Sequence, residues 1–96
     1  MKKLEKEFNR RGFKFTKVYR EGCLAIYERV GKGCKYWETI QIKQVPDQEK
    51  FGKVIEAHEG YPGDEEFGYI AYCCMSYDAA MKRIKELRKR KELANG

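Results

Sequence analysis

The sequence predicts an α+β fold, an antiparallel four- to five-stranded meander sheet flanked by an N-terminal and a C-terminal helix. Three observations predict it. From residue 13 to residue 43, apolar and polar residues alternate with the period of two that is typical of half-buried strands. Glycines interrupt that alternation at Gly22 and at 31–33, where hairpins are expected. From Tyr77 onward, the apolar residues adopt the spacing of a helix instead.

The N-terminal helix is expected at residues 2–11. Leu4 and Phe8 lie four residues apart, which places them on one helical face, and the other side chains of this segment are polar or charged. Gly12 follows as a residue typical of the position directly after a helix.

Three strands are expected next: 13–20, 23–30 and 34–43. Along the first strand, three aromatic residues alternate and are expected on one face: Phe13, Phe15 and Tyr19. The rings of Tyr27, Trp37 and Tyr72 are expected on the face opposite the helices, where nucleic-acid bases could stack. The competing expectation is that residues 44–68 fold over that face, and partial cover is favoured.

Residues 44–68 connect the third strand to the fourth and are less regular. Residues 51–58 either extend the sheet or pair locally. The proline and glycine at 61–63 fit a type II turn. Asp64 is placed to cap a single helical turn that Gly68 ends.

The last two elements have clearer signals. A fourth strand is expected at 69–75, where both faces are apolar and the strand should be central or covered. Ser76 is a good N-cap for a helix that runs from Tyr77 to about Leu93. Basic residues enter the apolar stripe after Leu87, so past that point either the helix leaves the core or its basic side chains snorkel to solvent.

Charge is segregated along the chain. The formal net charge is +6, and residues 44–68 contain seven acidic against two basic residues, so the rest carries +11. This excess is larger than solubility requires and predicts a surface that contacts a phosphate backbone. The residues expected to make that contact are Lys3, Lys6, Lys82, Arg83, Lys85, Lys89 and Arg90.

The alternative interpretation of the final helix is a solvated face with internal ion pairs. Asp78 and Lys82, and likewise Glu86 and Arg90, have the i,i+4 spacing of such pairs. Each pair contributes only a few tenths of a kcal/mol. The sequence does not separate this alternative from phosphate binding.

The residues favour a non-enzymatic protein without cofactor or metal. The single histidine, His58, leaves no acyl-transfer triad to assemble around it. The four cysteines include the neighbours Cys73 and Cys74 but no Cys-x-x-Cys, so free thiols are expected rather than a zinc site. The acids at 64–66 lack the fixed spacing of cation ligands.

The 96 residues have room for one small domain, spanning 1–96. No apolar run approaches the length that crosses a bilayer, and acids follow the first lysines where a signal peptide would be apolar. We therefore expect a cytoplasmic protein that does not enter a membrane.

One segment carries a family resemblance: residues 61–68, Tyr-Pro-Gly-Asp-Glu-Glu-Phe-Gly, which we name the hook. With the run 36–42 and the Ser-capped helix, the hook resembles small accessory proteins of tailed phages and prophages of gut bacteria. The resemblance covers roughly residues 13–87. It implies a bacterial host cell and a compact sheet-plus-helix fold, but no reaction.

Such phage proteins commonly bind nucleic acid or inhibit a host machine. Our leading hypothesis is a binding module whose basic helix surface contacts nucleic acid or a nucleoprotein. The alternative is a protein inhibitor of a host defence or transcription enzyme, similar to anti-CRISPR proteins, with the acidic hook mimicking phosphate; a purely structural accessory protein ranks third. The residues expected to contact a protein partner are Trp37, Tyr61, Asp64, Glu65, Glu66 and Phe67.

Overall fold

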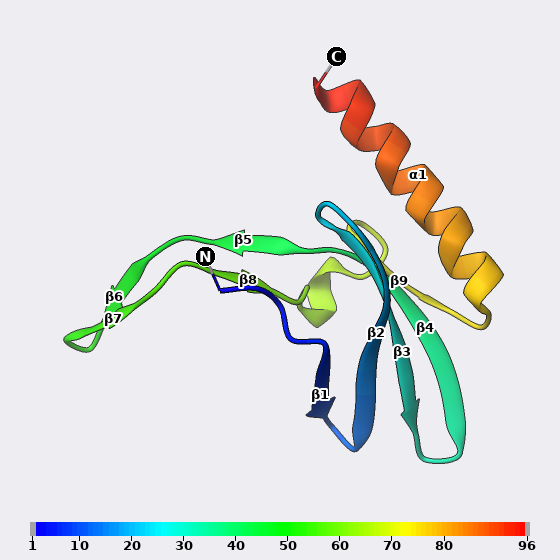
Figure 1. Ribbon diagram of the computed structural model, residues 1–96, viewed down its shortest axis with the longest axis horizontal. Helices are drawn as coiled ribbons and strands as arrows, with labels where there is room; N and C mark the ends of the chain where they lie inside the picture. Colours follow the sequence, from blue (N-terminus) through cyan, green and yellow to red (C-terminus); the bar gives the residue numbers. More distant parts are fainter. Residues whose placement is uncertain (1, 96) are drawn as a thin grey trace.

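The computed structural model describes residues 2–95 and contains a five-stranded antiparallel sheet, a β-ribbon arm and one long helix (Figure 1). In chain order the elements are β1 (Glu7–Arg10), β2 (Phe13–Glu21), β3 (Leu24–Gly31), β4 (Cys34–Gln41), β5 (Lys43–Val45), β6 (Gln48–Lys50), β7 (Lys53–Ile55), β8 (His58–Gly60), the 3-10 turn η1 (Asp64–Glu66), β9 (Ala71–Cys74) and α1 (Tyr77–Asn95). The sheet order is β1-β2-β3-β4-β9. The prediction of an α+β fold with an antiparallel sheet and a C-terminal helix is confirmed.

The prediction of an N-terminal helix is wrong, because the segment forms the edge strand β1. Phe8 lies opposite Phe15 on β2, and the two rings stack with their centroids 4.7 Å apart. Arg11 and Gly12 both have positive φ and form the two-residue turn that starts β2. The spacing of Leu4 and Phe8 does not distinguish a helix from a strand, since residues four apart share a face in both.

A β-bulge in β2 changes the face that one aromatic residue occupies. Phe15 lies opposite Arg29 and Lys17 opposite Tyr27, but the register then shifts and Tyr19 pairs with Ile26. Because of the extra residue, each later side chain of β2 points to the opposite face of the sheet from the one that simple alternation would give it. Tyr19 therefore packs on the opposite face from Phe15, which corrects the prediction that they share one.

Both faces of the sheet are buried, each by a different part of the chain. One face carries the cluster Phe13, Phe15, Ala25, Tyr27, Ile40, Ile42 and Ala71, on which Leu4, Phe8, Tyr61 and Phe67 pack. The other carries Leu24, Ile26 and Cys74, covered by Ala80, Ile84 and Leu87 of α1, with Tyr19, Trp37 and Tyr72 beside them. The prediction that three rings lie on the face opposite the helix is wrong for Trp37 and Tyr72, which lie on the helix face. Tyr27 does lie on the opposite face, where it is fully buried and Tyr61 of residues 44–68 packs against it.

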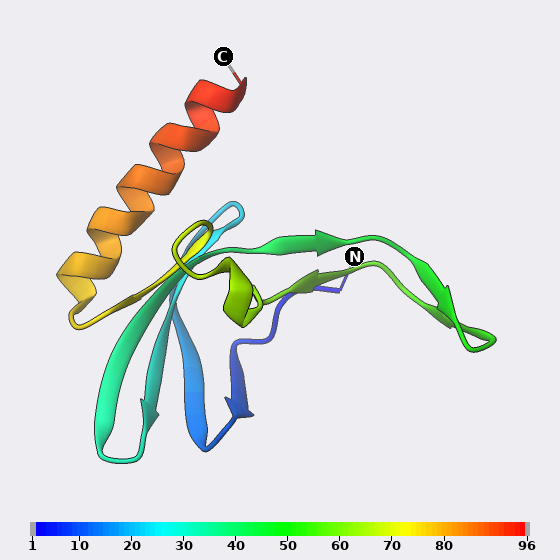
Figure 2. The ribbon, with the colours of Figure 1, turned by 180° about the vertical axis from the view of Figure 1, so that it is seen from behind.

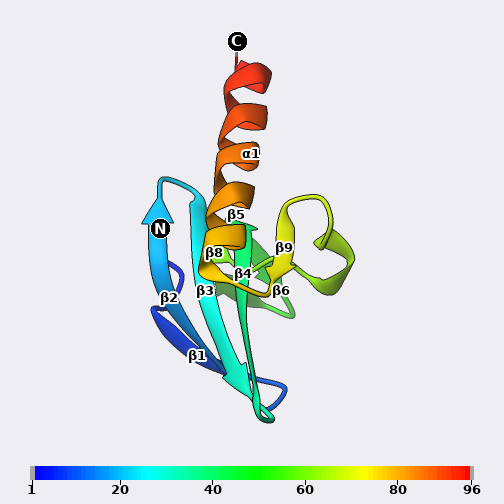
Figure 3. The ribbon, with the colours of Figure 1, turned by 90° about the vertical axis from the view of Figure 1, so that its right-hand side faces the viewer.

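The helix α1 begins as predicted. The Ser76 side chain accepts a hydrogen bond from the Ala79 amide at 3.1 Å, which satisfies a backbone donor of the first turn. Ala80, Ile84 and Leu87 are buried, whereas Leu93 is 73% exposed. The C-terminal half of α1 accordingly extends past the end of the strands (Figure 3).

Residues 43–60 form the arm, a β-ribbon that extends from the sheet (Figures 1 and 2). β5 pairs with β8 at its base, β6 pairs with β7 further out, and the turn at 51–52 is its tip. The alternative of local pairing for residues 51–58 is thus the observed one. The fifth strand of the main sheet is β1 instead.

A buried ion pair joins the arm to the sheet and to the N-terminal segment. Arg20 of β2 donates to both carboxylate oxygens of Glu59, at 2.7 and 2.6 Å, and the Leu4 amide donates to the same carboxylate at 2.9 Å. The Glu59 side chain is only 6% exposed. The Arg20 hydrogen bonds lower the pKa of Glu59 to about 2.

Gly31 lies at a close approach between two hairpins. A Cβ on Gly31 would lie 2.5 Å from the Gly12 carbonyl oxygen and 2.9 Å from the Phe13 ring, and its φ is not in the left-handed region. We predict that Gly31→Ala destabilises the protein by about 3 kcal/mol through this overlap with backbone. Gly22→Ala, with φ +56 and no atom within 4 Å, should cost only about 1 kcal/mol of backbone strain. Urea unfolding checks this, and equal losses would contradict it.

The Glu59 ion pair gives a prediction about pH. Because its pKa is about 2 in the folded protein and near 4.5 otherwise, the carboxylate stabilises the fold above about pH 4.5. That stability is lost as the pH falls toward 2. We expect Glu59→Gln to cost about 3 kcal/mol at pH 7 and to differ little from wild type at pH 2. Melting temperatures of both proteins across this range measure the difference, and a gap independent of pH would refute the assignment.

Candidate nucleic-acid interface

One flank of α1 carries three lysines, Lys82, Lys85 and Lys89, which we name the lysine flank. All three are exposed. Within residues 2–95, the structure gives their side chains neither an ion pair nor a hydrogen bond. Asp78 does not pair with Lys82 among these residues, so the positive charge of this flank is open to a ligand.

The arginines of α1 are held by partners inside the protein. The Arg83 guanidinium lies 4.3 Å from the Tyr72 ring centroid and pairs with Glu86 at 2.9 Å. Arg90 donates to the Tyr69 carbonyl at 2.9 Å and to the Tyr72 hydroxyl at 2.8 Å. Glu86 thus pairs with Arg83 rather than with Arg90. Arg83 and Arg90 were both expected to contact phosphate. Instead they hold α1 against β9 and against the segment that precedes β9.

Further contacts hold the projecting half of α1 near the turn between β2 and β3. Arg88 forms two hydrogen bonds to Glu21, whose carboxylate also accepts from the Tyr19 hydroxyl at 2.7 Å. The Arg88 hydrogen bonds hold the pKa of Glu21 below its usual range. Lys91 lies 3.1 Å from the Cys23 sulfur. These contacts orient α1 so that the lysine flank faces solvent rather than the sheet.

Lys3 and Lys6 lie away from the lysine flank. Leu4 packs with the cluster on one face of the sheet, and α1 covers the other face. The Lys2 amide donates to the Ala57 carbonyl at 3.2 Å, which places this segment beside the arm. Lys3 and Lys6 could extend the lysine flank only if an N-terminal helix packed beside α1. The structure has a strand there instead, so these lysines do not join the flank.

The hook packs against the sheet through its two rings. The Tyr61 ring lies 5.3 to 5.8 Å from those of Phe8, Phe15 and Tyr27, and its hydroxyl donates to Glu38 at 2.6 Å. Burial raises the pKa of Tyr61 far above its usual range. Phe67 packs on the same cluster. The aromatic residues expected to contact a partner thus serve the core, as does Trp37 under α1.

The acidic part of the hook stays at the surface. Glu66 pairs with Lys43 at 2.6 Å, Glu65 is exposed, and the side chain of Asp64 lies outside the described residues. The predicted helical turn is confirmed as η1. The type II turn is wrong, because Gly63 does not have the positive φ that this turn requires.

An arginine-lined pocket of about 170 Å³ opens on the hook side of the sheet, and sequence reasoning missed it. Arg10, Arg11 and Arg29 line it from β1, its turn and β3. Arg29 stacks on Phe13 at 4.0 Å and pairs with Glu38 at 2.8 Å, while its buried Nε has no hydrogen-bond partner among the described side chains and backbone. The neighbouring arginines of the turn at residues 10–12 can be seen in the sequence. Arg29 comes to lie beside them only because β2 pairs with β3.

The cysteines are free thiols on different sides of the sheet. Cys74 is buried under α1, whereas Cys73 lines the arginine pocket on the other face. Burial raises the pKa of both thiols, which disfavours the reactive thiolate. In the part of the chain that the structure describes, no group of three or more metal-binding side chains forms. No helix among these residues is long and apolar enough to cross a membrane.

Comparison with known proteins returns no match to a family model, to a curated protein or to a solved structure.

Two buried tyrosines predict a loss of stability at high pH. Burial raises the pKa of Tyr27 to about 12, and that of Tyr61 is raised further. The unfolded chain ionises its tyrosines near pH 10, so their contribution is complete below pH 10 and is lost as the pH rises toward 12. Tyr61→Phe should cost about 1 kcal/mol at pH 8 and lose less stability than wild type between pH 8 and 11. Urea unfolding at both pH values tests this; equal losses would contradict it.

Proposed function

We propose that the protein is a non-enzymatic nucleic-acid-binding protein whose lysine flank contacts the phosphate backbone. One observation carries this proposal. The arginines of α1 are occupied by Tyr72, Glu86 and Glu21, whereas the three lysines of the flank have no partner within residues 2–95. Unpaired cations on a fixed, exposed helix are the residues that release counterions when they meet phosphates.

The geometry of the flank suits an extended polyanion. Lys82 and Lys89 lie about 10 Å apart along the helix axis, and the three lysines fall within about 60° of arc. Duplex DNA presents one phosphate per about 1.7 Å of its axis, so a row of this length spans several phosphates. The row also includes the part of α1 that extends past the strands, where a ligand has access (Figure 3).

The placement of the acidic residues supports the same proposal. The arm and α1 extend on opposite sides of the sheet (Figures 1 and 2), so the acids of residues 44–68 do not cover the flank. Asp47, Glu59 and Glu66 also have partners inside the protein. The arginine pocket adds a second basic surface on the hook side.

The alternative function, inhibition of a host defence or transcription enzyme, has one supporting observation. The hook is held against the sheet by Tyr61 and against the base of the arm by the Lys43–Glu66 pair, and it exposes Glu65. A fixed acidic projection of this kind is suited to a basic site on a protein. A protein partner captured from nuclease-treated lysate, without any binding to free nucleic acid, would favour this alternative.

Charge reversal tests the lysine flank. We expect Lys82→Glu, Lys85→Glu and Lys89→Glu together to weaken binding to DNA or RNA at least tenfold at about 50 mM salt, for all sequences alike. The salt dependence should flatten by about 0.7 to 0.9 for each phosphate that is no longer neutralised. Stability should barely change, because exposed charges contribute only tenths of a kcal/mol. Fluorescence anisotropy with labelled oligonucleotides at several salt concentrations measures both the affinity and its salt dependence.

A matched control reverses the same number of charges elsewhere. Lys14, Lys32 and Lys35 lie at the hairpin end of the sheet, and their joint change to glutamate alters the net charge equally. We expect this control to bind nearly as well as wild type. Equal loss in both variants would show that only total charge matters. A wild-type protein that does not bind either nucleic acid would refute the proposed function.

A further inference from the structure

The tip of the arm, residues 50–53, presents an aromatic side chain entirely to solvent. The Phe51 residue is 101% exposed, the highest value among the exposed large apolar residues. Phe51 and Gly52 have φ of 53° and 74°, which makes the tip a two-residue type I′ turn. That turn favours asparagine, aspartate or glycine, and a bulky residue there is strained. Neither burial nor turn chemistry accounts for a phenylalanine at this position.

The two lysines beside Phe51 are also unfavourable in the isolated ribbon. Lys50 and Lys53 are directly opposite each other in the register of β6 and β7. Cross-strand partners share one face of a ribbon, and like charges placed so are destabilising. Glu49 pairs with Val54 on the other face and does not relieve this repulsion. The tip thus carries a fully exposed ring and two cations on one side.

The base of the arm is braced, in contrast to its tip. Asp47 accepts a hydrogen bond from the Ala57 amide at 2.5 Å across the bend between its two halves. Lys2 forms a bridge to His58, and the Glu59 ion pair fixes β8 to the sheet. The tip is therefore held away from the body of the protein (Figure 1).

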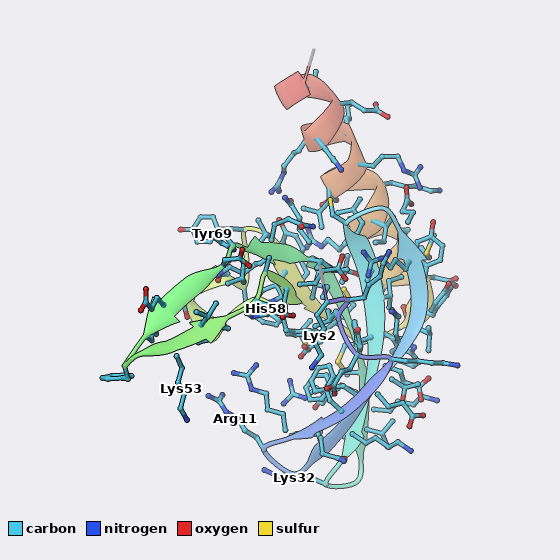
Figure 4. The ribbon with its side chains drawn as sticks, turned by 60° about the vertical axis from the view of Figure 1, so that its left-hand side comes forward. Lys2, Arg11, Lys32, Lys53, His58 and Tyr69 are labelled. Atoms are coloured by element: carbon cyan, nitrogen blue, oxygen red, sulfur yellow. The ribbon has the colours of Figure 1, made fainter. Side chains whose placement is uncertain are left out.

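The lysine side of the tip faces the same way as the basic end of β1. Figure 4 shows Lys53 pointing from the arm toward the side of the molecule where Arg11 and Lys2 lie. A pocket of about 570 Å³ lies between the base of the arm and the N-terminal segment, lined by Lys2, Ile55 and other residues of both. Glu5 and Glu56 also line this pocket, so an anionic ligand would approach the tip of the arm, where Lys50 and Lys53 lie, rather than the pocket.

We propose that the arm is a nucleic-acid wedge: Phe51 inserts between bases while Lys50 and Lys53 contact the phosphates on either side. The inference rests on the proposed function and adds a second contact to it. Apolar side chains at the ends of projecting elements unstack base steps in this way, and aromatic rings stack on bases of any sequence. Phosphates would relieve the repulsion between the two lysines, and the base stack would bury the exposed ring.

The test uses the full chain and oligonucleotides of about 20 nucleotides, single-stranded and duplex, with 2-aminopurine at spaced positions. Unstacking of this base raises its fluorescence. We expect wild type to raise the signal on binding. Phe51→Asn, which suits the positive φ, should remove that rise and weaken binding about tenfold, with unchanged or higher thermal stability. Phe51→Trp should keep the fluorescence rise.

The lysines of the tip have a separate readout. Lys50→Gln with Lys53→Gln should flatten the salt dependence by about 1.4 to 1.8 in total. At saturation, the 2-aminopurine signal should equal that of wild type.

The outcomes separate this inference from the proposed function. If wild type binds the oligonucleotides and Phe51→Asn binds them equally with the same fluorescence rise, the wedge is wrong and the lysine flank is unaffected. If Phe51→Asn changes only the capture of a protein partner, the wedge is likewise wrong. If wild type does not bind any of the oligonucleotides, both proposals fail.

Discussion

The buried carboxylate of Glu59 is the constraint on which the arrangement of this protein depends. It receives hydrogen bonds from Arg20 on β2 and from the backbone of Leu4, so one charge joins the sheet, the N-terminal segment and the arm. A carboxylate so removed from water needs every one of these donors. Moving any of the three segments would leave a buried charge unsatisfied. The direction of the arm and the cover over one sheet face are both fixed by this requirement.

Arginine and lysine have different tasks in this chain. The guanidinium groups of Arg20 and Arg88 form paired hydrogen bonds with carboxylates, and those of Arg29 and Arg83 stack on rings. A planar fork of donors suits both kinds of contact, whereas an ammonium group is a hydrated point charge. The arginines therefore hold the elements together, and lysines of α1 and of the arm tip remain for a ligand. This division is why total charge alone does not locate the proposed binding surface.

The two proposed contact surfaces are separated by the sheet. The molecule is flat, with extents of 44, 41 and 22 Å, and the arm and α1 leave the sheet on opposite sides. Each projection is braced where it meets the sheet, the arm by Glu59 and the helix by Glu21 and Tyr72. A long polyanion is a ligand whose charge extends far enough to meet both.

The sequence by itself determined the meander of β2 to β4, the Ser76 cap, the course of α1 and the lysine flank, because each depends on neighbours within a few residues. Tertiary structure decided what depends on distant partners. Leu4 and Phe8 fit a strand as well as a helix until Phe15 is beside them. Which sheet face α1 covers was undetermined because both faces are apolar. The Leu4 amide and the Glu59 carboxylate that it binds are 55 positions apart, and the arginine pocket brings Arg10 near Cys73; no local pattern encodes such contacts.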